Sequence, residues 1–134
     1  MRIFRSEQTP FKAGDTASFV GPVHTRLLGA GQEGTPVNVY HVRFESGGRT
    51  NWHSHSGAQW LFVTEGRVRI QLHGEQPQDL EVGDAVIIFP GEKHWHGAAP
   101  GGDGVHLAVN VNAETTWLEP VDDAEYEPTF ETGL

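Results

Sequence analysis

Apolar residues alternate with polar ones along most of this chain and rarely recur at the spacing of a helical face. Glycine and proline interrupt the alternation roughly every eight to twelve residues, which is typical of short strands joined by turns. The Glu65-Gly66 pair has the composition of a tight hairpin turn. The pattern predicts an all-β domain with strands at residues 23–28, 37–44, 50–55, 59–64, 67–72, 85–89, 94–97 and 105–111.

Two His-x-His pairs lie within these predicted strands. In a strand, residues i and i+2 point to the same side and lie roughly 6.6 Å apart. His53 and His55 therefore aim two imidazoles at one spot. His94 and His96 do the same from another strand, and only one of this second pair can reach the same ion over a bond of roughly 2.1 Å. The arrangement predicts a metal site with one histidine left over to contact a bound molecule.

The parity of the strands also predicts what surrounds such a site. Gln59 follows a three-residue turn after the first pair, and it can fold back beside the pair. Trp52, Trp60 and Trp95 fall on faces opposite the histidines, where they can fill space between sheets or form an intersubunit surface. A cavity beside the ion would be lined by residues that share one parity, Tyr40, Val42, Phe44 and Asn110. His24, His41 and His73 are interpreted as ordinary surface or core histidines.

Composition limits the classes of function. The chain has 134 residues, no cysteine and a net charge of −9, so one domain without thiolate chemistry is expected. The negative charge, without a basic stripe, argues against nucleic acid as a partner. No run is long enough to span a membrane and the start has no signal-like apolar region, so a cytoplasmic protein is expected.

The acidic end is expected to be a solvated tail that Trp117, Leu118 and Tyr126 could anchor. Arg49 and Lys93 are interpreted as solvated charges.

The histidine pairs and the residues around them resemble the two motifs of the cupin superfamily. Gly47, His53, His55, Gln59 and Gly66 stand at the positions of the first motif, with Gln59 in place of the usual Glu. Gly83, Pro90, Gly91 and His94 resemble the second. The resemblance implies a small single-domain cupin β-barrel, a double-stranded β-helix like a jelly roll. It divides the chain into an N-terminal strand segment, 1–36, a barrel core, 37–111, and an acidic C-terminal segment, 112–134. It also implies a homodimer in which the N-terminal strand can be exchanged.

Longer stretches resemble bacterial manganese-dependent cupins with hydroxynitrile lyase activity and cupins associated with carboxymuconolactone decarboxylases. These stretches are residues 47–55, which read GGRTNWHSH, and residues 89–100, which read FPGEKHWHGAAP. The resemblance implies one divalent transition metal ion per chain, manganese first, with Fe, Zn, Ni and Co as alternatives. The implied ligands are His53, His55, Gln59 and His94. His96 and His106 would then lie just outside the ligand set as catalytic residues.

Neutral imidazoles and a neutral amide would leave a divalent ion with its full charge, so an anion should bind at its open positions. This favours a lyase of the hydroxynitrile lyase type that acts on a small molecule, with the metal as Lewis acid and His96, by its ordinary pKa near 6.5, as general base. One alternative is an iron dioxygenase acting on a small enolisable or phenolic substrate. Another is a cupin that binds a small molecule without catalysis.

Overall fold

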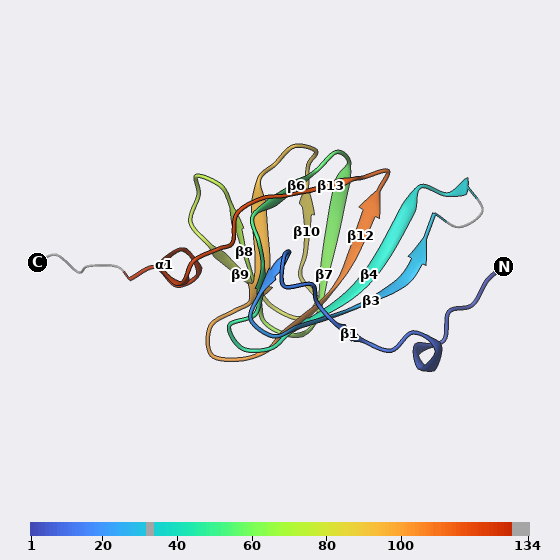
Figure 1. Ribbon diagram of the computed structural model, residues 1–134, viewed down its shortest axis with the longest axis horizontal. Helices are drawn as coiled ribbons and strands as arrows, with labels where there is room; N and C mark the ends of the chain where they lie inside the picture. The colour runs from blue at the N-terminus through green and yellow to red at the C-terminus, as the bar shows by residue number, and fades with distance from the viewer. Residues whose placement is uncertain (32–33, 130–134) are drawn as a thin grey trace, which may run out of the picture.

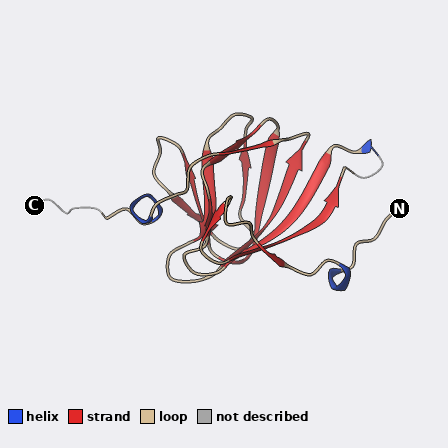
Figure 2. Ribbon diagram, in the orientation of Figure 1, coloured by secondary structure: helices blue, strands red, loops and turns tan. Residues whose placement is uncertain are grey.

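The computed structural model describes residues 1–31 and 34–129, and these residues form two antiparallel sheets (Figures 1 and 2). The strands are β1 Lys12–Ala13, β2 Phe19–Val20, β3 Val23–Ala30, β4 Val37–Phe44, β5 Arg49–Thr50, β6 His53–His55, β7 Ala58–Gly66, β8 Val68–Leu72, β9 Gln78–Leu80, β10 Ala85–Ile88, β11 His94–Ala98, β12 Gly104–Val111 and β13 Thr115–Trp117. A 3-10 turn at Ser6–Gln8 and a short helix, α1, at Asp123–Tyr126 lie toward the two ends of the chain. The predicted all-β architecture is confirmed, and no helix among the described residues is long and apolar enough to cross a membrane.

One sheet has the strand order β1-β3-β4-β12-β7-β10. In the other, β13, β6, β11, β5 and β2 follow one another, while β8 pairs with both β11 and β9. Strand β11 is central to this second sheet, because β8 lies along one edge and β5 and β6 lie in succession along the other. The two sheets face each other around a core, and β3 and β4 extend beyond that core at one side (Figure 1).

The predicted strand over residues 50–55 is wrong in one respect, because it is broken in two. At the break, the backbone N–H of Asn51 donates to the carbonyl of Ser18, and that of Trp52 donates to the carbonyl of Glu119. The backbone therefore leaves the ladder to bond two loops that are distant in the sequence. Strand β6 after the break carries His53 and His55.

Alternating burial confirms the predicted faces. Along β7, Gln59, Leu61 and Val63 are buried, whereas Trp60 and Phe62 are exposed. The inward residues of the two sheets form the core. One group holds Val23, Val42, Phe44 and Ala98, and another holds Leu61, Ile70, Ile88 and Ala108.

The acidic C-terminal segment is not a solvated tail over the residues that the structure describes, 112–129. Val121 is 1% exposed and Tyr126 is 5% exposed, and both pack against Trp52 and Trp95 on the outer side of the second sheet. The side chain of Asp122 caps α1. We call residues 115–126, from β13 to α1, the C-terminal strap.

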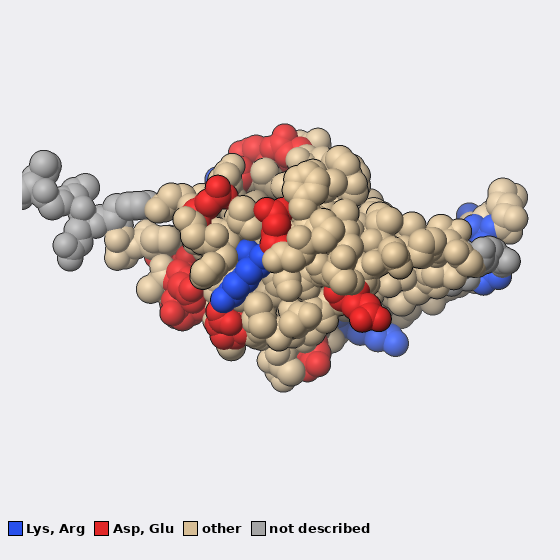
Figure 3. Space-filling view, turned by 90° about the horizontal axis from the view of Figure 1, so that it is seen from above, with Lys and Arg blue, Asp and Glu red and all other residues tan. Residues whose placement is uncertain are grey.

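Arg49 is also not a solvated charge, because its guanidinium group is buried under the strap. It donates two hydrogen bonds to the carbonyl of Val121, at 3.1 and 2.6 Å, and one to the carboxylate of Asp123 at 3.0 Å. The same group lies 4.6 Å from the centre of the Tyr126 ring. Lys93 is less buried and pairs with Glu119. Figure 3 shows acidic side chains over one face of the molecule, among which the basic side chains drawn there form no stripe.

Candidate metal centre

Four imidazole rings lie together in the interior, on the inward face of β6 and β11. The ring centres of His53 and His94 are 4.2 Å apart, and His53 lies 4.9 Å from His55 and 5.2 Å from His96. Register explains the cluster, because His94 stands opposite His53 in the ladder and the i+2 rule turns each second histidine inward. All four side chains are buried.

One ring nitrogen from each of His53, His94 and His96 lies within 4.8 Å of the other two. Nitrogens at such separations can share an ion with bonds of about 2.1 Å. This group differs in one member from the ligand set implied by the cupin resemblance, since it holds His96 where that set has His55. His53 and His94 belong to both sets.

The other nitrogen of three rings is held by an oxygen atom. Nδ1 of His53 donates to the carbonyl of Asn51 at 2.8 Å, and Nδ1 of His94 donates to the carbonyl of Glu92 at 2.9 Å. Nδ1 of His55 lies 2.9 Å from Oγ1 of Thr115. A carbonyl can only accept, so the first two contacts place the proton of His53 and His94 on Nδ1 and leave their Nε2 free to bind a metal, whereas the hydroxyl of Thr115 can accept from His55 or donate to it.

Several buried polar atoms face the cluster without a partner among the described residues. They include Nε2 of His55 and Nε2 of His96. The amide of Gln59 donates to Oδ1 of Asn110 at 2.8 Å, which turns its Oε1 toward Nε2 of His94 at 3.3 Å. Buried polar atoms normally have hydrogen-bond partners. The free lone pairs on these nitrogen and amide oxygen atoms therefore fit a divalent ion.

Burial keeps these histidines neutral, which is the form that binds metals. It lowers the pKa of His94 to about 4. Burial is also the main reason why the pKa of His53 and that of His55 are lowered. The expectation of an ordinary pKa near 6.5 for His96 is wrong, because complete burial, and next the neighbouring His106, lowers its pKa well below that value.

His106 of β12 completes an imidazole pair with His96. Its Nε2 lies 2.9 Å from Nδ1 of His96, and burial lowers the pKa of His106 to about 3. The ring of Phe44 packs against both, with centres 6.0 Å from His96 and 5.3 Å from His106. Phe44 thus covers one side of the imidazole pair with an apolar ring.

The residues predicted to line a cavity reach the site to different degrees. Phe44 contacts the imidazole pair, and Asn110 holds the amide of Gln59. Val42 is buried behind Phe44, and half-buried Tyr40 packs between the two core groups. A cavity of about 240 Å³ that includes His94 has different walls between the sheet edges, among them Ile70, Leu80, Val86 and Ile88. These four residues were not predicted from the sequence, although their alternation within short strands is a usable signal.

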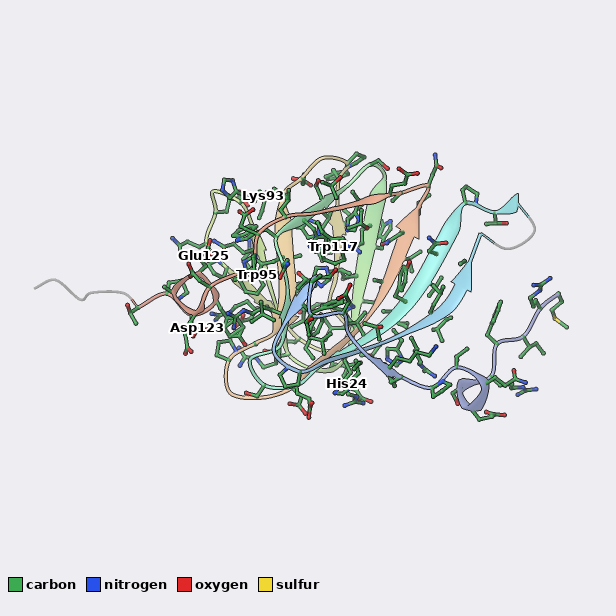
Figure 4. The ribbon with its side chains drawn as sticks, in the orientation of Figure 1. His24, Lys93, Trp95, Trp117, Asp123 and Glu125 are labelled. Atoms are coloured by element: carbon green, nitrogen blue, oxygen red, sulfur yellow. The ribbon has the colours of Figure 1, made fainter. Side chains whose placement is uncertain are left out.

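The strap also supplies residues whose contacts with the histidine cluster were not predicted from the sequence. Thr115 contacts His55, and the ring of Trp117 lies 4.7 Å from that of His53. In the view of Figure 4, Trp95 lies toward α1, near Asp123 and Glu125, whereas the partly exposed Trp117 lies farther from α1. Trp52 and Trp95 do fill buried space on the face opposite the histidines, as predicted. Among the other histidines, His24 pairs with Glu45 and His41 with Arg26.

A barrel of two antiparallel sheets with an inward histidine cluster defines a class of β-barrel proteins that can hold a metal ion. The profile of the cupin domain matches residues 40–111 of this chain. The chain belongs to the cupin domain family.

Individual relatives agree with this assignment. The (R)-mandelonitrile lyase of Granulicella tundricola is 39% identical over 111 residues, which cover 81% of this chain and 85% of the relative. A cupin-like protein from Thermotoga maritima is 38% identical, with a TM-score of 0.84 over 90% of this chain and 93% of that one. A polyketide cyclase from Streptomyces resistomycificus has a TM-score of 0.73 at 20% identity, over 95% and 91% of the two chains, and shows the fold alone.

Proposed function

We propose that this protein is a metal-dependent lyase of the hydroxynitrile lyase type. The observation that carries the proposal is the buried cluster of neutral imidazoles with unpartnered Nε2 atoms. The similarity to a (R)-mandelonitrile lyase, at 39% identity, supports this reaction class. We propose manganese as the native metal, one ion per chain.

The proposed ligands are His53, His55, Gln59 and His94, and the hydrogen bonds support this choice. Nδ1 of each proposed histidine ligand contacts an oxygen atom, as is usual for metal-bound histidines. Nδ1 of His96 instead contacts another imidazole. An imidazole pair that lies against the ligands suits proton handling better than a ligand role.

When bound, the ion supplies positive charge that can stabilise a leaving anion such as cyanide. Nε2 of His96 would accept the hydroxyl proton of a cyanohydrin, and the carbon–carbon bond would break with its electron pair leaving on cyanide. The proton would then return to cyanide, which leaves as HCN beside the carbonyl product. The low pKa of His96 keeps its imidazole neutral before the reaction and favours return of the proton from its protonated form. The apolar walls at Ile70, Leu80, Val86 and Ile88 suit an aromatic or aliphatic carbonyl compound.

The test combines elemental analysis of the purified protein with a cyanohydrin cleavage assay on mandelonitrile. Manganese-loaded protein should cleave mandelonitrile, and metal-free protein and the His96→Ala variant should lose most of this activity. Full turnover by metal-free protein or by His96→Ala would contradict the proposal. Oxygen uptake by iron-loaded protein with a β-diketone, without cyanohydrin cleavage, would replace it with a dioxygenase. No turnover with any metal would favour a binding protein.

We also propose that two copies form a homodimer through the outer face of the six-stranded sheet. Trp60 and Phe62 stack there with ring planes 12° apart and are 39% and 40% exposed. Val109 lies opposite Trp60 and also opposite Val39, so this part of the face is apolar and can be buried against a second copy. Light scattering should give twice the chain mass of 14.7 kDa, and Trp60→Glu should reduce it to one chain.

A further inference from the structure

Thr115 lies outside the matched cupin domain, which ends at residue 111, yet its hydroxyl contacts His55 of the histidine cluster. It is the first residue of β13, and β13 runs antiparallel to β6. In this ladder Thr115 stands opposite His55 and Trp117 opposite His53. The alternation of the strand therefore turns Thr115 and Trp117 toward the histidines and Thr116 away from them.

The three proposed histidine ligands are held in two different ways. His53 and His94 are each fixed by a backbone carbonyl two residues earlier in the chain, which no side-chain substitution removes. His55 depends on a side chain 60 residues later. Its Nε2 is buried without a hydrogen bond among the described residues, and its ring packs against those of His53 and His94, so the hydroxyl of Thr115 at Nδ1 supplies the directional polar contact of this ring.

The rest of the strap holds β13 in place. The backbone N–H of Leu118 donates to the carbonyl of Trp52, and the N–H of Trp52 donates to the carbonyl of Glu119. Further along, Val121 is buried and its carbonyl accepts two hydrogen bonds from Arg49. Thr115 thus stands on a strand that is held by pairing with β6, by backbone hydrogen bonds directly after it and by the docking of Val121 further along.

We infer that Thr115 is a positioning residue that fixes the tautomer and the orientation of His55, so that the C-terminal strap is part of the metal centre. The hydroxyl accepts the Nδ1 proton, which leaves the Nε2 lone pair directed at the ion. This inference rests on the proposed function in one respect, that His55 is a ligand. Loss of such a hydrogen-bond partner usually weakens metal binding about 10- to 100-fold.

The experiment measures Mn²⁺ affinity by isothermal titration calorimetry in four variants of the full chain. Thr115→Val removes the hydroxyl at nearly constant volume, and Thr115→Ser keeps the hydroxyl but removes the methyl group. Thr116→Val is the matched control, because Thr116 is the same residue type on the same strand, exposed on the opposite face. His55→Ala tests the ligand itself. Long-range ¹H–¹⁵N spectra of the metal-free protein report which nitrogen of His55 carries the proton.

Thr115→Val should bind Mn²⁺ about 10- to 100-fold more weakly and lose the pure Nδ1–H form of His55. Thr115→Ser and Thr116→Val should both behave like the wild type. If His55→Ala binds Mn²⁺ as tightly as the wild type, the proposed ligand set is wrong. If His55→Ala loses the metal but Thr115→Val keeps both wild-type affinity and the Nδ1–H form, the inference about Thr115 is wrong. An equal loss in Thr116→Val would likewise overturn it.

Discussion

The two faces of strand β11 differ in whether their buried polar atoms have hydrogen-bond partners. His94 and His96 point inward to a cluster that contains buried polar atoms without partners among the described residues. Trp95, between them, points outward into a cluster with Trp52 and Tyr126, where the polar tips are all bonded. Nε1 of Trp95 donates to Gln71, Nε1 of Trp52 donates to Glu125, and the hydroxyl of Tyr126 donates to the carbonyl of Ala98.

One face of β11 is suited to binding an ion, and the other face stabilises the fold. A buried polar group without a partner costs free energy, so the inward face lowers the stability of the metal-free protein and is ready to bind an ion. The outward face combines large aromatic burial with complete hydrogen bonding, and it compensates for that cost. Substitutions on the two faces should therefore affect different measurements.

The largest effect is expected from His94→Ala on metal binding. His94 belongs both to the geometric group and to the proposed ligand set, so its loss should weaken Mn²⁺ binding by more than about 100-fold, beyond the usual effect of losing an outer hydrogen-bond partner. Calorimetric titration with Mn²⁺ and elemental analysis measure this change. The metal-free variant should still fold, with a smaller loss of unfolding free energy than Trp95→Ala shows. Wild-type affinity would exclude His94 as a ligand.

Trp95→Ala should show the reverse pattern. Its side chain is fully buried, so truncation should lower the free energy of unfolding by about 3–5 kcal/mol in urea titrations. The folded fraction should bind Mn²⁺ with unchanged affinity, because the indole does not face the cluster. If the alanine variant does not fold, Trp95→Phe serves as the milder test of the same face. A loss of metal affinity without a loss of stability would invalidate the separation of the two faces.

Acid should destabilise the inward face of the metal-free protein. His94 has a pKa of about 4 in the folded state, against an ordinary value of 6.5 when the chain is unfolded. Between these values the unfolded chain binds more protons, so the free energy of unfolding should fall as the pH falls. The slope is about 1.4 kcal/mol per pH unit for each histidine proton. Urea titrations from pH 7 to pH 4 measure it, and His94→Gln should reduce it. A flat profile would show that the histidines are not buried.

The inward face could be predicted from the sequence because its determinants are local. The spacing of His53 from His55 and of His94 from His96 sets their common faces, and alternation along residues 59–63 sets the barrel wall. Pairing between strands distant in the sequence then brings the histidine pairs together, as the cupin motifs implied.

The outward face could not be predicted in the same way, because it depends on contacts across long sequence separations. Arg49 is buried by carbonyl and carboxylate groups more than seventy residues later. The charge of the C-terminal segment suggested solvation, although the cap at Asp122 and the apolar Val121 and Tyr126 dock it. On the inward face, the lowered pKa of His96 could not be predicted either, because it depends on complete burial, which composition does not reveal.

The smallest effect is expected from Tyr126→Phe, which changes one hydrogen bond on the outward face. The phenyl ring would keep its packing against Trp95, with ring centres 5.7 Å apart in the wild type, but the carbonyl of Ala98 would lose its donor from the hydroxyl. The free energy of unfolding should fall by about 1 kcal/mol in urea titrations, a typical value for one buried hydrogen bond. Mn²⁺ affinity should stay the same, since the ring still holds the strap. A weakened affinity with unchanged stability would mean that the hydroxyl of Tyr126 acts on the metal centre through the strap, and the two faces would then be coupled.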